Sequence, residues 1–288
     1  MTADQLIVIV NLTALVSIML SMGLQTKLDA VVASVRQIRL VVLCVIANYV
    51  LVPLVALGLL WVFQADPFVS IGFIILAVCP AAPVGPPLTV IAKGNLSLAV
   101  GMMIVLAALS SFLSPTLLSL LLARVAPQND LQVDYLAIGR TLLIAQLLPL
   151  ALGLAFHKWA PKLTGRITRP VGLFANVMMM VLIVAIIYAQ YETLAAIRSK
   201  GWIGMAAILA ASLAIGWWCG GRNQTNRKAT AITTAPRNAA VGLAIATGNF
   251  ANTPAVTAVV AYGLVSMLGT MAFALILRKS IGNEIPPN

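Results

Sequence analysis

One cation stands where a fixed charge is costly. Arg237 belongs to the segment TTAPRN, from Thr233 to Asn238, inside an otherwise apolar stretch. Burying an unpaired arginine in a membrane costs at least about 2.5 to 3.5 kcal/mol, even on the mildest scale. No acidic residue lies near it in the sequence. A bound anion would supply the missing charge, so Arg237 is predicted to bind an anionic ligand.

A structural role for Arg237 is the alternative. Its guanidinium carries five N–H donors, which can bond to backbone carbonyls freed where a helix is interrupted. In that case the side chain would hold the fold together and never contact a ligand. The sequence leaves both roles open.

A second unusual segment, CPAAPVGPP, runs from Cys79 to Pro87 and holds four prolines and a glycine in nine residues. Proline removes a backbone donor and clashes with the preceding turn, so no continuous helix passes through it. The pattern predicts one half-helix up to about Val78 and another from near Pro86 or Pro87. Unpaired backbone at membrane depth is tolerated only when it is buried in protein or lines a watery cavity.

Pro236 predicts a similar break beside Arg237. Asn238 can cap a second half-helix through AAVGLAIATG, because its side chain can accept a freed N–H. The N-termini of both second half-helices would add positive dipole ends near the same cavity. Single prolines elsewhere, Pro53, Pro115 and Pro149, predict simple kinks.

The elements that carry these segments are membrane helices. The chain is 61% hydrophobic and 9% charged, against about 25% charged in soluble domains. Apolar runs of about 20 residues, enough to cross the bilayer, recur throughout. We therefore expect an all-α polytopic membrane protein that forms a single domain over 1–288. About nine spans are predicted, near 4–23, 38–63, 68–93, 96–123, 135–157, 170–190, 201–220, 227–250 and 254–277.

Basic residues mark one side of the membrane. They cluster on alternate connections, at Lys27, Arg36 and Arg39, at Lys158, Lys162, Arg166 and Arg169, at Arg222, Arg227 and Lys228, and at Arg278 and Lys279. The intervening connections hold the acids Asp66, Asp130, Asp134 and Glu192 with fewer basic residues. The positive-inside rule then places the N-terminus outside and the C-terminus inside.

The two breaks are five spans apart, so their helices have opposite orientations. This spacing predicts an inverted repeat of two units, about 4–124 and 135–277, each with its broken helix third of four. Asn11 and Asn176 occupy comparable places near the starts of the two units. Both are therefore candidate substrate ligands.

Other classes of function are disfavoured. The net charge of +11 comes from the basic connections, which the positive-inside rule explains without nucleic acid. Cys44, Cys79 and Cys219 lie in separate spans without metal-ligand spacing. The spans hold no paired carboxylates and no activated nucleophile, so neither catalytic residues nor a metal site is predicted.

The residues resemble the bile acid:sodium symporter family over most of the chain. The resemblance rests on SMGLQTKLD from Ser21, on CPAAPVGPPLTVIAKGN from Cys79, and on RNAAVGLAIATGNFANTP from Arg237. The second of these is similar to the family's CPGG, TASN and LAKGD pattern. The resemblance implies a panel bundle and a core bundle, with two broken helices crossing in the core and alternating access between the bundles.

The resemblance also implies where sodium would bind, and the chain departs from that pattern. The resemblance places the family's serine and asparagine at Gly85 and Pro86 of this chain. It places the hydroxyl residues of the next helix at Ala99 and Met103, and the glutamate and glutamine at Thr233 and Arg237. Hardly any sodium ligand remains. Arg237 is thus interpreted as a permanent substitute for the cation.

The predicted function is a secondary transporter of small organic anions with sodium coupling lost or altered and no cofactor. Its candidate substrate ligands are Arg237, Asn238, Thr233, Thr234, Gly85, Pro86, Asn11 and Asn176. A conventional sodium symporter is the first alternative, with Thr233, Thr234 and backbone carbonyls rebuilding a weaker sodium site. A membrane-embedded anion sensor without transport is the second. The lack of a transit-like leader favours a bacterial plasma membrane, and the oligomeric state stays open.

Overall fold

The structure is a computed structural model of the chain, and it describes all residues except 1–2, 126–132, 190, 196, 252 and 281–288. Asp130, assigned above to a connection, falls outside the described residues. Every described element is a helix. This confirms the all-α fold class.

Most helices lie within the predicted apolar runs, but Pro161–Ala189 begins nine residues before the run predicted at 170–190, and Leu28–Val35 is a helix in a predicted connection. The first half of the chain contains α1 (Ala3–Gln25), α2 (Leu28–Val35), α3 (Ile38–Ile46), the π-helical turn η1 (Ala47–Leu51), α4 (Val52–Phe63), α5 (Pro67–Ala77), α6 (Gly85–Ile91) and α7 (Leu96–Val125). The second half contains α8 (Tyr135–Leu142), the π-helical turn η2 (Leu143–Leu147), α9 (Leu148–Trp159), α10 (Pro161–Ala189), α11 (Tyr191–Ala195), α12 (Ser199–Cys219), α13 (Gln224–Thr234), α14 (Ala239–Asn249) and α15 (Pro254–Ser280).

Five described helices are long and apolar enough to cross a membrane. They are Ile38–Phe63, Leu96–Val125, Tyr135–Trp159, Ser199–Cys219 and Pro254–Arg278. Two shorter apolar helices, Ile9–Gln25 and Pro67–Ala77, accompany them. The two broken helices are not among these five, because each of their halves is too short to cross a membrane alone. The chain is therefore polytopic, while nine crossings, their orientation and the inverted repeat stay predictions.

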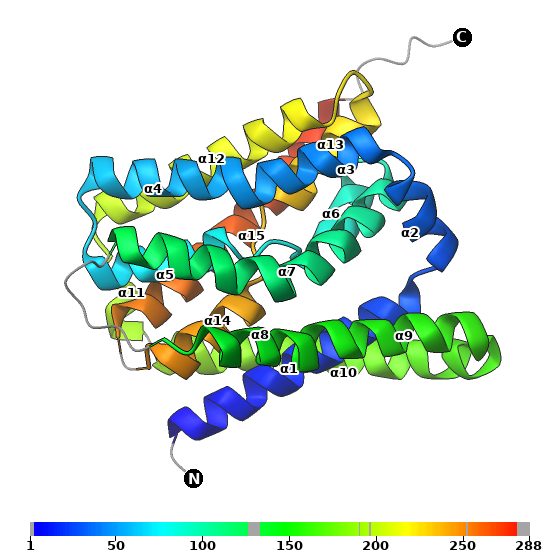
Figure 1. Cartoon of the computed structure of the whole chain (residues 1–288), viewed down its shortest axis with the longest axis horizontal. Coiled ribbons are helices and arrows are strands. Elements are labelled where there is room, and N and C mark those ends of the chain that lie inside the picture. The colour runs from blue at the N-terminus through cyan, green and yellow to red at the C-terminus, as the bar shows by residue number, and fades with distance from the viewer. Residues whose placement is uncertain (1–2, 126–132, 190, 196, 252, 281–288) are drawn as a thin grey trace.

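The helices form two layers, which Figure 1 shows one above the other. The panel layer consists of α1, which packs on α9 and α10, together with α8 and η2. The core layer consists of α3 to α7 and α12 to α15, where α12 packs on α4 and α13, and α15 packs on α5. Contacts of α1 with α14 and of α7 with α8 join the layers. This is the kind of division that the family resemblance implies.

Glycine permits the closest approach inside the panel layer. A Cβ atom on Gly23 of α1 would lie 2.4 Å from the carbonyl oxygen of Leu150, and one on Gly153 of α9 would lie 2.5 Å from that of Leu20. Membrane helices associate through such small residues, because lipid gives apolar side chains no reason to leave it. The two glycines therefore fix α1 against α9.

Two of the isolated prolines do more than kink a helix. Pro53 and Pro149 each follow a π-helical turn, η1 and η2, whereas Pro115 lies within the continuous α7. A proline leaves the carbonyl four residues earlier without its usual donor, and a π-turn absorbs that mismatch. The turns bury Asn48 and Tyr49 of η1 and Gln146 of η2. These polar side chains thereby reach the protein interior.

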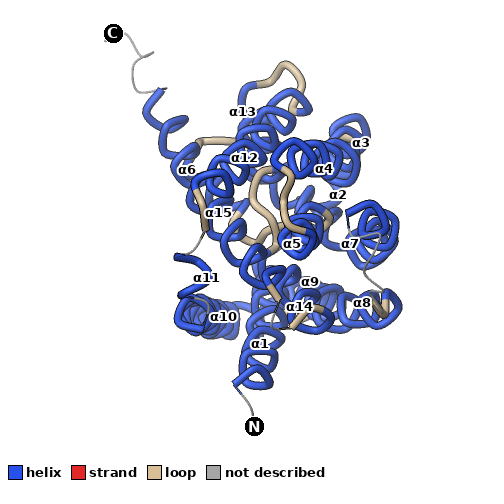
Figure 2. The backbone as a smooth tube through the Cα atoms, turned by 90° about the vertical axis from the view of Figure 1, so that its left-hand side faces the viewer, coloured by secondary structure: helices blue, strands red, loops and turns tan. Residues whose placement is uncertain are grey.

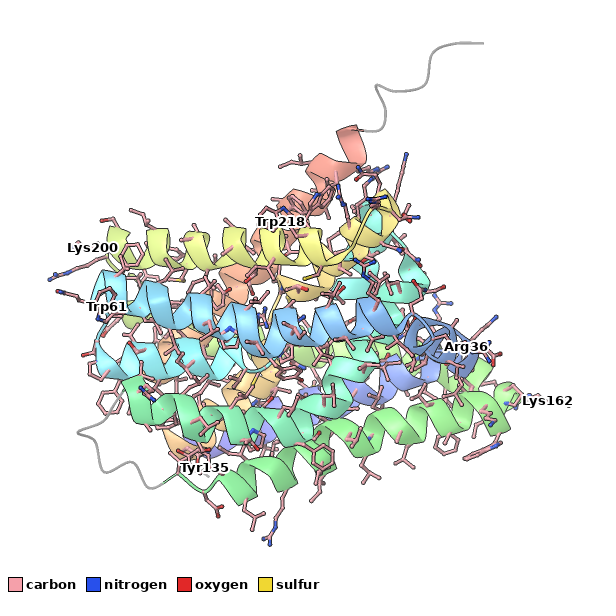
Figure 3. All side chains as sticks on the ribbon, turned by 45° about the horizontal axis from the view of Figure 1, so that its top comes forward. Arg36, Trp61, Tyr135, Lys162, Lys200 and Trp218 are labelled. Atoms are coloured by element: carbon pink, nitrogen blue, oxygen red, sulfur yellow. The ribbon has the colours of Figure 1, made fainter. Side chains whose placement is uncertain are left out.

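The charged residues labelled in Figure 3 separate along the long axis. Arg36 and Lys162 lie at one end, although they belong to different basic clusters. Lys200 lies at the opposite end with Trp61, which is 82% exposed. Indole rings favour the boundary between hydrocarbon and water. The labelled charges thus lie at the two ends of the long axis, and the direction of the bilayer normal stays a prediction.

Candidate functional site

The first break separates α5 from α6, as the prolines predict. The helix α5 ends at Ala77, and α6 begins at Gly85, one or two residues before the start predicted near Pro86 or Pro87. The hydroxyl of Ser114 in α7 donates to the carbonyl of Val78 at 2.5 Å. Ala81 adopts a positive φ of 69° within the break. A neighbouring helix thus satisfies one of the carbonyls that the broken ladder frees.

The second break separates α13, which ends at Thr234, from α14, which begins at Ala239. Asn238 is the N-cap of α14, and its Oδ1 accepts the backbone N–H of Val241 at 3.2 Å. The prediction of an asparagine cap is confirmed. Its amide satisfies one of the donors that every helix start leaves free.

The two breaks meet. The backbone N–H of Asn238 donates to the carbonyl of Cys79 at 2.9 Å, and its Nδ2 donates to that of Ala81 at 3.3 Å. On either side of this contact, α5 packs against α14 and α6 packs against α13. Each half of one broken helix therefore pairs with a half of the other, which places both breaks at one point.

Arg237 lies at that point and is only 3% exposed. Its Nη1 donates to Asn48 Oδ1 at 3.3 Å and to the carbonyl of Ala77 at 3.4 Å, and its Nη2 donates to the carbonyl of Thr234 at 2.5 Å. All three partners are neutral oxygens. Two of them are carbonyls at the ends of α5 and α13, so the capping role proposed for Arg237 is present.

Capping does not exhaust the donors of Arg237. Its Nε has no hydrogen-bond partner among the described residues. The buried Tyr262 of α15 lies near Arg237, close enough for the two side chains to interact. Buried donors without partners are rare and costly in folded proteins. The guanidinium of Arg237 thus keeps one donor, Nε, without a partner among the described residues, and the oxygens that it does bond to are all neutral.

A small cavity of about 80 Å³ borders this cluster. Arg237, Asn238, the first residues of α14 and the first break form one side of it, and α15 contributes Val259, Val260, Gly263, Leu264 and Met267. Met179 of α10 reaches it from the panel layer. The cavity therefore lies where the two layers meet, beside the positive N-terminus of α14.

The other predicted ligands of the broken helices lie close by, but not on this cavity. Thr233 and Thr234 are buried; the hydroxyl of Thr233 donates to the carbonyl of Ala229, and Thr234 Oγ1 accepts from Asn48 Nδ2 at 3.3 Å. Gly85 and Pro86 are buried where α6 meets α13, and a Cβ on Gly85 would lie 3.5 Å from Thr233 Cγ2. Gly85 and Thr233 thus lie where α6 meets α13, whereas Thr234 faces Asn48 of η1.

Asn11 and Asn176 occupy unlike environments. Asn11 in α1 is fully buried, and neither atom of its amide has a partner among the described residues. Asn176 is exposed on α10. Neither lines the cavity beside Arg237. Sequence position alone made them equivalent, whereas the packing of α1 against α9 and α10 separates them.

Tyr262 and Ser114 are site residues that the sequence did not single out. Both lie in long apolar helices without a break or a charge nearby. Hydroxyl groups in such helices usually bond to their own backbone or bridge to a neighbour, and nothing in the local sequence separates those cases. Only their spacing from the breaks in three dimensions identifies them.

Comparison with known proteins identifies the family. Residues 12–197 match the model of the Sodium Bile acid symporter family. The chain is similar to the "Uncharacterized sodium-dependent transporter YocS" of Bacillus subtilis (strain 168), with 28% identity over 83% of this chain and 74% of that protein. It is also similar to the "Probable sodium/metabolite cotransporter BASS2, chloroplastic" of Oryza sativa subsp. japonica, with 26% identity.

That second alignment covers 91% of this chain but 62% of the rice protein, so the chain spans less than two thirds of that relative. The family match ends before the second break, which leaves Arg237 outside the matched residues. The match nevertheless covers more than half of the chain and includes the first break. The chain thus belongs to the sodium bile acid symporter family, and it is an integral membrane transporter rather than an enzyme.

Proposed function

We propose that this transporter carries small organic anions by alternating access of the panel and core layers, and that Arg237 takes the place of the coupling sodium ion. The observation that carries the proposal is the position of the guanidinium. It occupies a cage of oxygens, from Asn48, Ala77 and Thr234, at the point where the two breaks meet.

Sodium and guanidinium are alternatives for such a cage. A sodium ion needs several oxygen donors, and the carbonyls of Ala77 and Thr234 with Asn48 Oδ1 are donors of that kind. A fixed cation among them repels a second one, at about 4 kcal/mol for two charges 4 Å apart in surroundings of intermediate dielectric constant. Sodium would therefore have to bind against the charge of Arg237.

The same charge suits an anion. The cavity beside Arg237 lies between the two layers, and its walls are mostly apolar apart from Arg237 and Asn238. An organic anion would place its charged group toward Arg237, whose Nε has no partner among the described residues. Asn238 is the second candidate ligand, although its Nδ2 already donates to Ala81.

A conventional sodium symporter remains the competing function. The names of both relatives contain the word sodium. The hydroxyls of Thr233 and Thr234 lie buried beside the cage and would contribute further oxygens. An anion sensor without transport is the alternative of another class, and it predicts ligand binding without flux.

The test measures stability and uptake together. Purified protein is heated with a panel of small carboxylates, each in sodium chloride and in potassium chloride, and uptake of the stabilising anion is followed in proteoliposomes. Arg237→Gln is compared with Arg166→Gln, which removes an exposed cation of α10. We expect equal stabilisation and uptake in both salts for the wild type and Arg166→Gln, and neither for Arg237→Gln.

Three results would contradict the proposal. Stabilisation that requires sodium identifies a conventional symporter. An unchanged response of Arg237→Gln removes the arginine from the site. Stabilisation with no uptake in either salt identifies a binding protein without transport.

The topology belongs to the proposal as well. Nine spans with the N-terminus outside, the inverted repeat and a bacterial plasma membrane are its expected setting. Cysteines introduced singly into the connections and labelled from one side of intact cells would test the orientation. Lys162 and Lys200 mark opposite ends of the molecule (Figure 3) and are suitable positions.

A further inference from the structure

A second and larger hollow lies at the end of the core layer that carries Trp61 and Lys200. Its volume is about 490 Å³, and it is formed by α4, α5, α12 and α15. Figure 2 looks along the bundle onto this end and shows these four helices around a common centre. We call it the end crevice. It is within the range of about 300–1,000 Å³ typical of small-molecule sites.

The walls of the end crevice are apolar. Leucine and phenylalanine side chains of α4 and α5 face methionine, isoleucine and alanine side chains of α12 and α15; among them are Leu59, Phe63, Phe73, Met205, Ile208 and Ala261. Apolar surface left in water costs roughly 25 cal/mol per Å². A crevice with such walls is therefore stabilised by a hydrocarbon group that fills it.

The mouth of the crevice is charged. It is bordered by Gln64 and Asp66 of the α4–α5 connection and by Arg198 and Lys200 at the start of α12. The Oδ1 of Asp66 accepts the N–H groups of Phe68 and Val69, so this carboxylate is engaged at the start of α5. Two cations then face one acid. The mouth favours a negatively charged group.

Arg198 and Lys200 are free to reach a ligand. Both side chains are exposed. In Figure 3 the side chain of Lys200 extends past the end of α12, so it borders the mouth rather than the interior. Long cationic side chains of this kind keep the charge in water while their stems lie on apolar surface. They can close over the charged end of a bound molecule.

The end crevice is separate from the cavity at Arg237. The helix α15 lies between them, with Thr257, Ala258 and Ala261 toward the crevice and Val260, Gly263 and Leu264 toward the cavity. The rings of Phe73 and Tyr262 pack with their centroids 5.4 Å apart. Phe73 lines the crevice, and Tyr262 lies near Arg237. The two hollows therefore share a wall but no lining residue.

We propose that the end crevice is a second binding site, which takes a water-soluble amphiphilic anion with its acidic group at Arg198 and Lys200 and its hydrocarbon part among the four helices. The residues of its mouth belong to the α4–α5 connection and to the start of α12, so we place the entrance of the ligand on the side of the water rather than the bilayer. This site does not depend on what Arg237 binds.

The structure offers a matched pair of variants to test it. A Cβ on Gly204 of α12 would meet Phe63 at 3.7 Å, an ordinary contact, so Gly204→Leu places its side chain in the crevice. Gly58 of α4 is exposed and has nothing within 4 Å of its Cβ, so Gly58→Leu is the control outside the crevice. Arg198→Gln/Lys200→Gln removes the charge of the mouth, and Arg36→Gln/Lys162→Gln is its control at the opposite end.

The probes are 4-butylbenzoate and its neutral counterpart 4-butylbenzamide, added to the purified full chain in a neutral detergent. Binding is measured as the rise in Tm across a concentration series. We expect the benzoate to bind the wild type, Gly58→Leu and Arg36→Gln/Lys162→Gln alike. Gly204→Leu should abolish binding, and the Arg198→Gln/Lys200→Gln variant should bind at least about tenfold more weakly.

Several outcomes overturn the proposal. They are equal binding by Gly204→Leu and the wild type, equal stabilisation by the neutral benzamide, and no stabilisation by either probe. Loss of binding in Arg237→Gln, with Gly204→Leu unaffected, would assign the probe to the cavity at the crossing instead. The exposed charge variants keep the test valid even where Gly204→Leu fails to fold.

Discussion

The two helix breaks do opposite things at the point where they meet. The first break supplies acceptors, the carbonyls of Ala77, Cys79 and Ala81. The second supplies donors, from the side chain of Arg237 and from the backbone and side chain of Asn238. The sequence predicts these segments as equivalent parts of an inverted repeat, yet their chemistry is complementary rather than alike.

Proline explains the difference. Four of the nine residues from Cys79 to Pro87 have no backbone N–H, so this segment has carbonyls to offer and few donors. The second break has one proline, followed at once by an arginine and an asparagine. The comparison shows that the positive charge at the crossing comes from one side only. Different substitutions should therefore destabilise the two breaks.

The largest effect should follow removal of the donor side. Arg237→Gln loses the charge, and glutamine has two N–H groups where the arginine uses three. Each buried acceptor left unsatisfied costs about 1–3 kcal/mol, so Tm should fall strongly. If the guanidinium replaces sodium, sodium chloride should recover part of the lost Tm and potassium chloride should not. Thermal unfolding in both salts measures this, and recovery by neither salt would mean that no cation site lies beneath the arginine.

Neutralising the same charge without removing it should act almost as strongly on ligand binding. Asn48→Asp places a carboxylate where the amide oxygen lies 3.3 Å from Nη1 of Arg237. The pair satisfies the arginine internally, so an organic anion that stabilises the wild type should bind at least about tenfold more weakly. Asn223→Asp is the control, since aspartate also caps a helix. Unchanged anion affinity in Asn48→Asp would show that the charge of Arg237 is not what the ligand senses.

The two asparagine caps give the next comparison. Asn238→Ala loses a cap worth about 1 kcal/mol and a bond to Ala81 worth about as much again. Asn223→Ala, at the exposed start of α13, loses the cap and a solvent-exposed bond from the Thr225 hydroxyl, which contributes little. The first variant should therefore unfold at a clearly lower temperature than the second. Equal losses would mean that the contact of Asn238 with the first break adds nothing to stability.

The smallest effect is expected on the acceptor side. Ser114→Ala removes the hydroxyl that bonds to the carbonyl of Val78, at a cost of about 1 kcal/mol. Ser119→Ala, on an exposed turn of the same helix, should cost close to nothing. The difference in Tm between the two variants measures the support that α7 gives to the end of α5. No difference would leave the first break stable without it.

The sequence carries much of the fold because covalent and local effects decide it. Apolar runs fix where helices form, and prolines fix where they stop, since a missing N–H and a locked φ act on adjacent turns whatever the surroundings. The cap at Asn238 is equally local. Local effects likewise predict a distortion of the helix at Pro53 and Pro149. They do not predict its form, because the choice between a kink and a π-turn depends on what packs against the bend.

What the sequence by itself determined is therefore the set of membrane helices, the two breaks and a cation that needs a partner. Only the tertiary structure decided which residues are the hydrogen-bond partners of Arg237. Arg237 bonds to Asn48 and Ala77, which are 189 and 160 residues away. Asn11 is buried while Asn176 is exposed, and the end crevice exists only where four helices diverge. Such contacts depend on how helices pack, and a pattern along one chain does not contain that information.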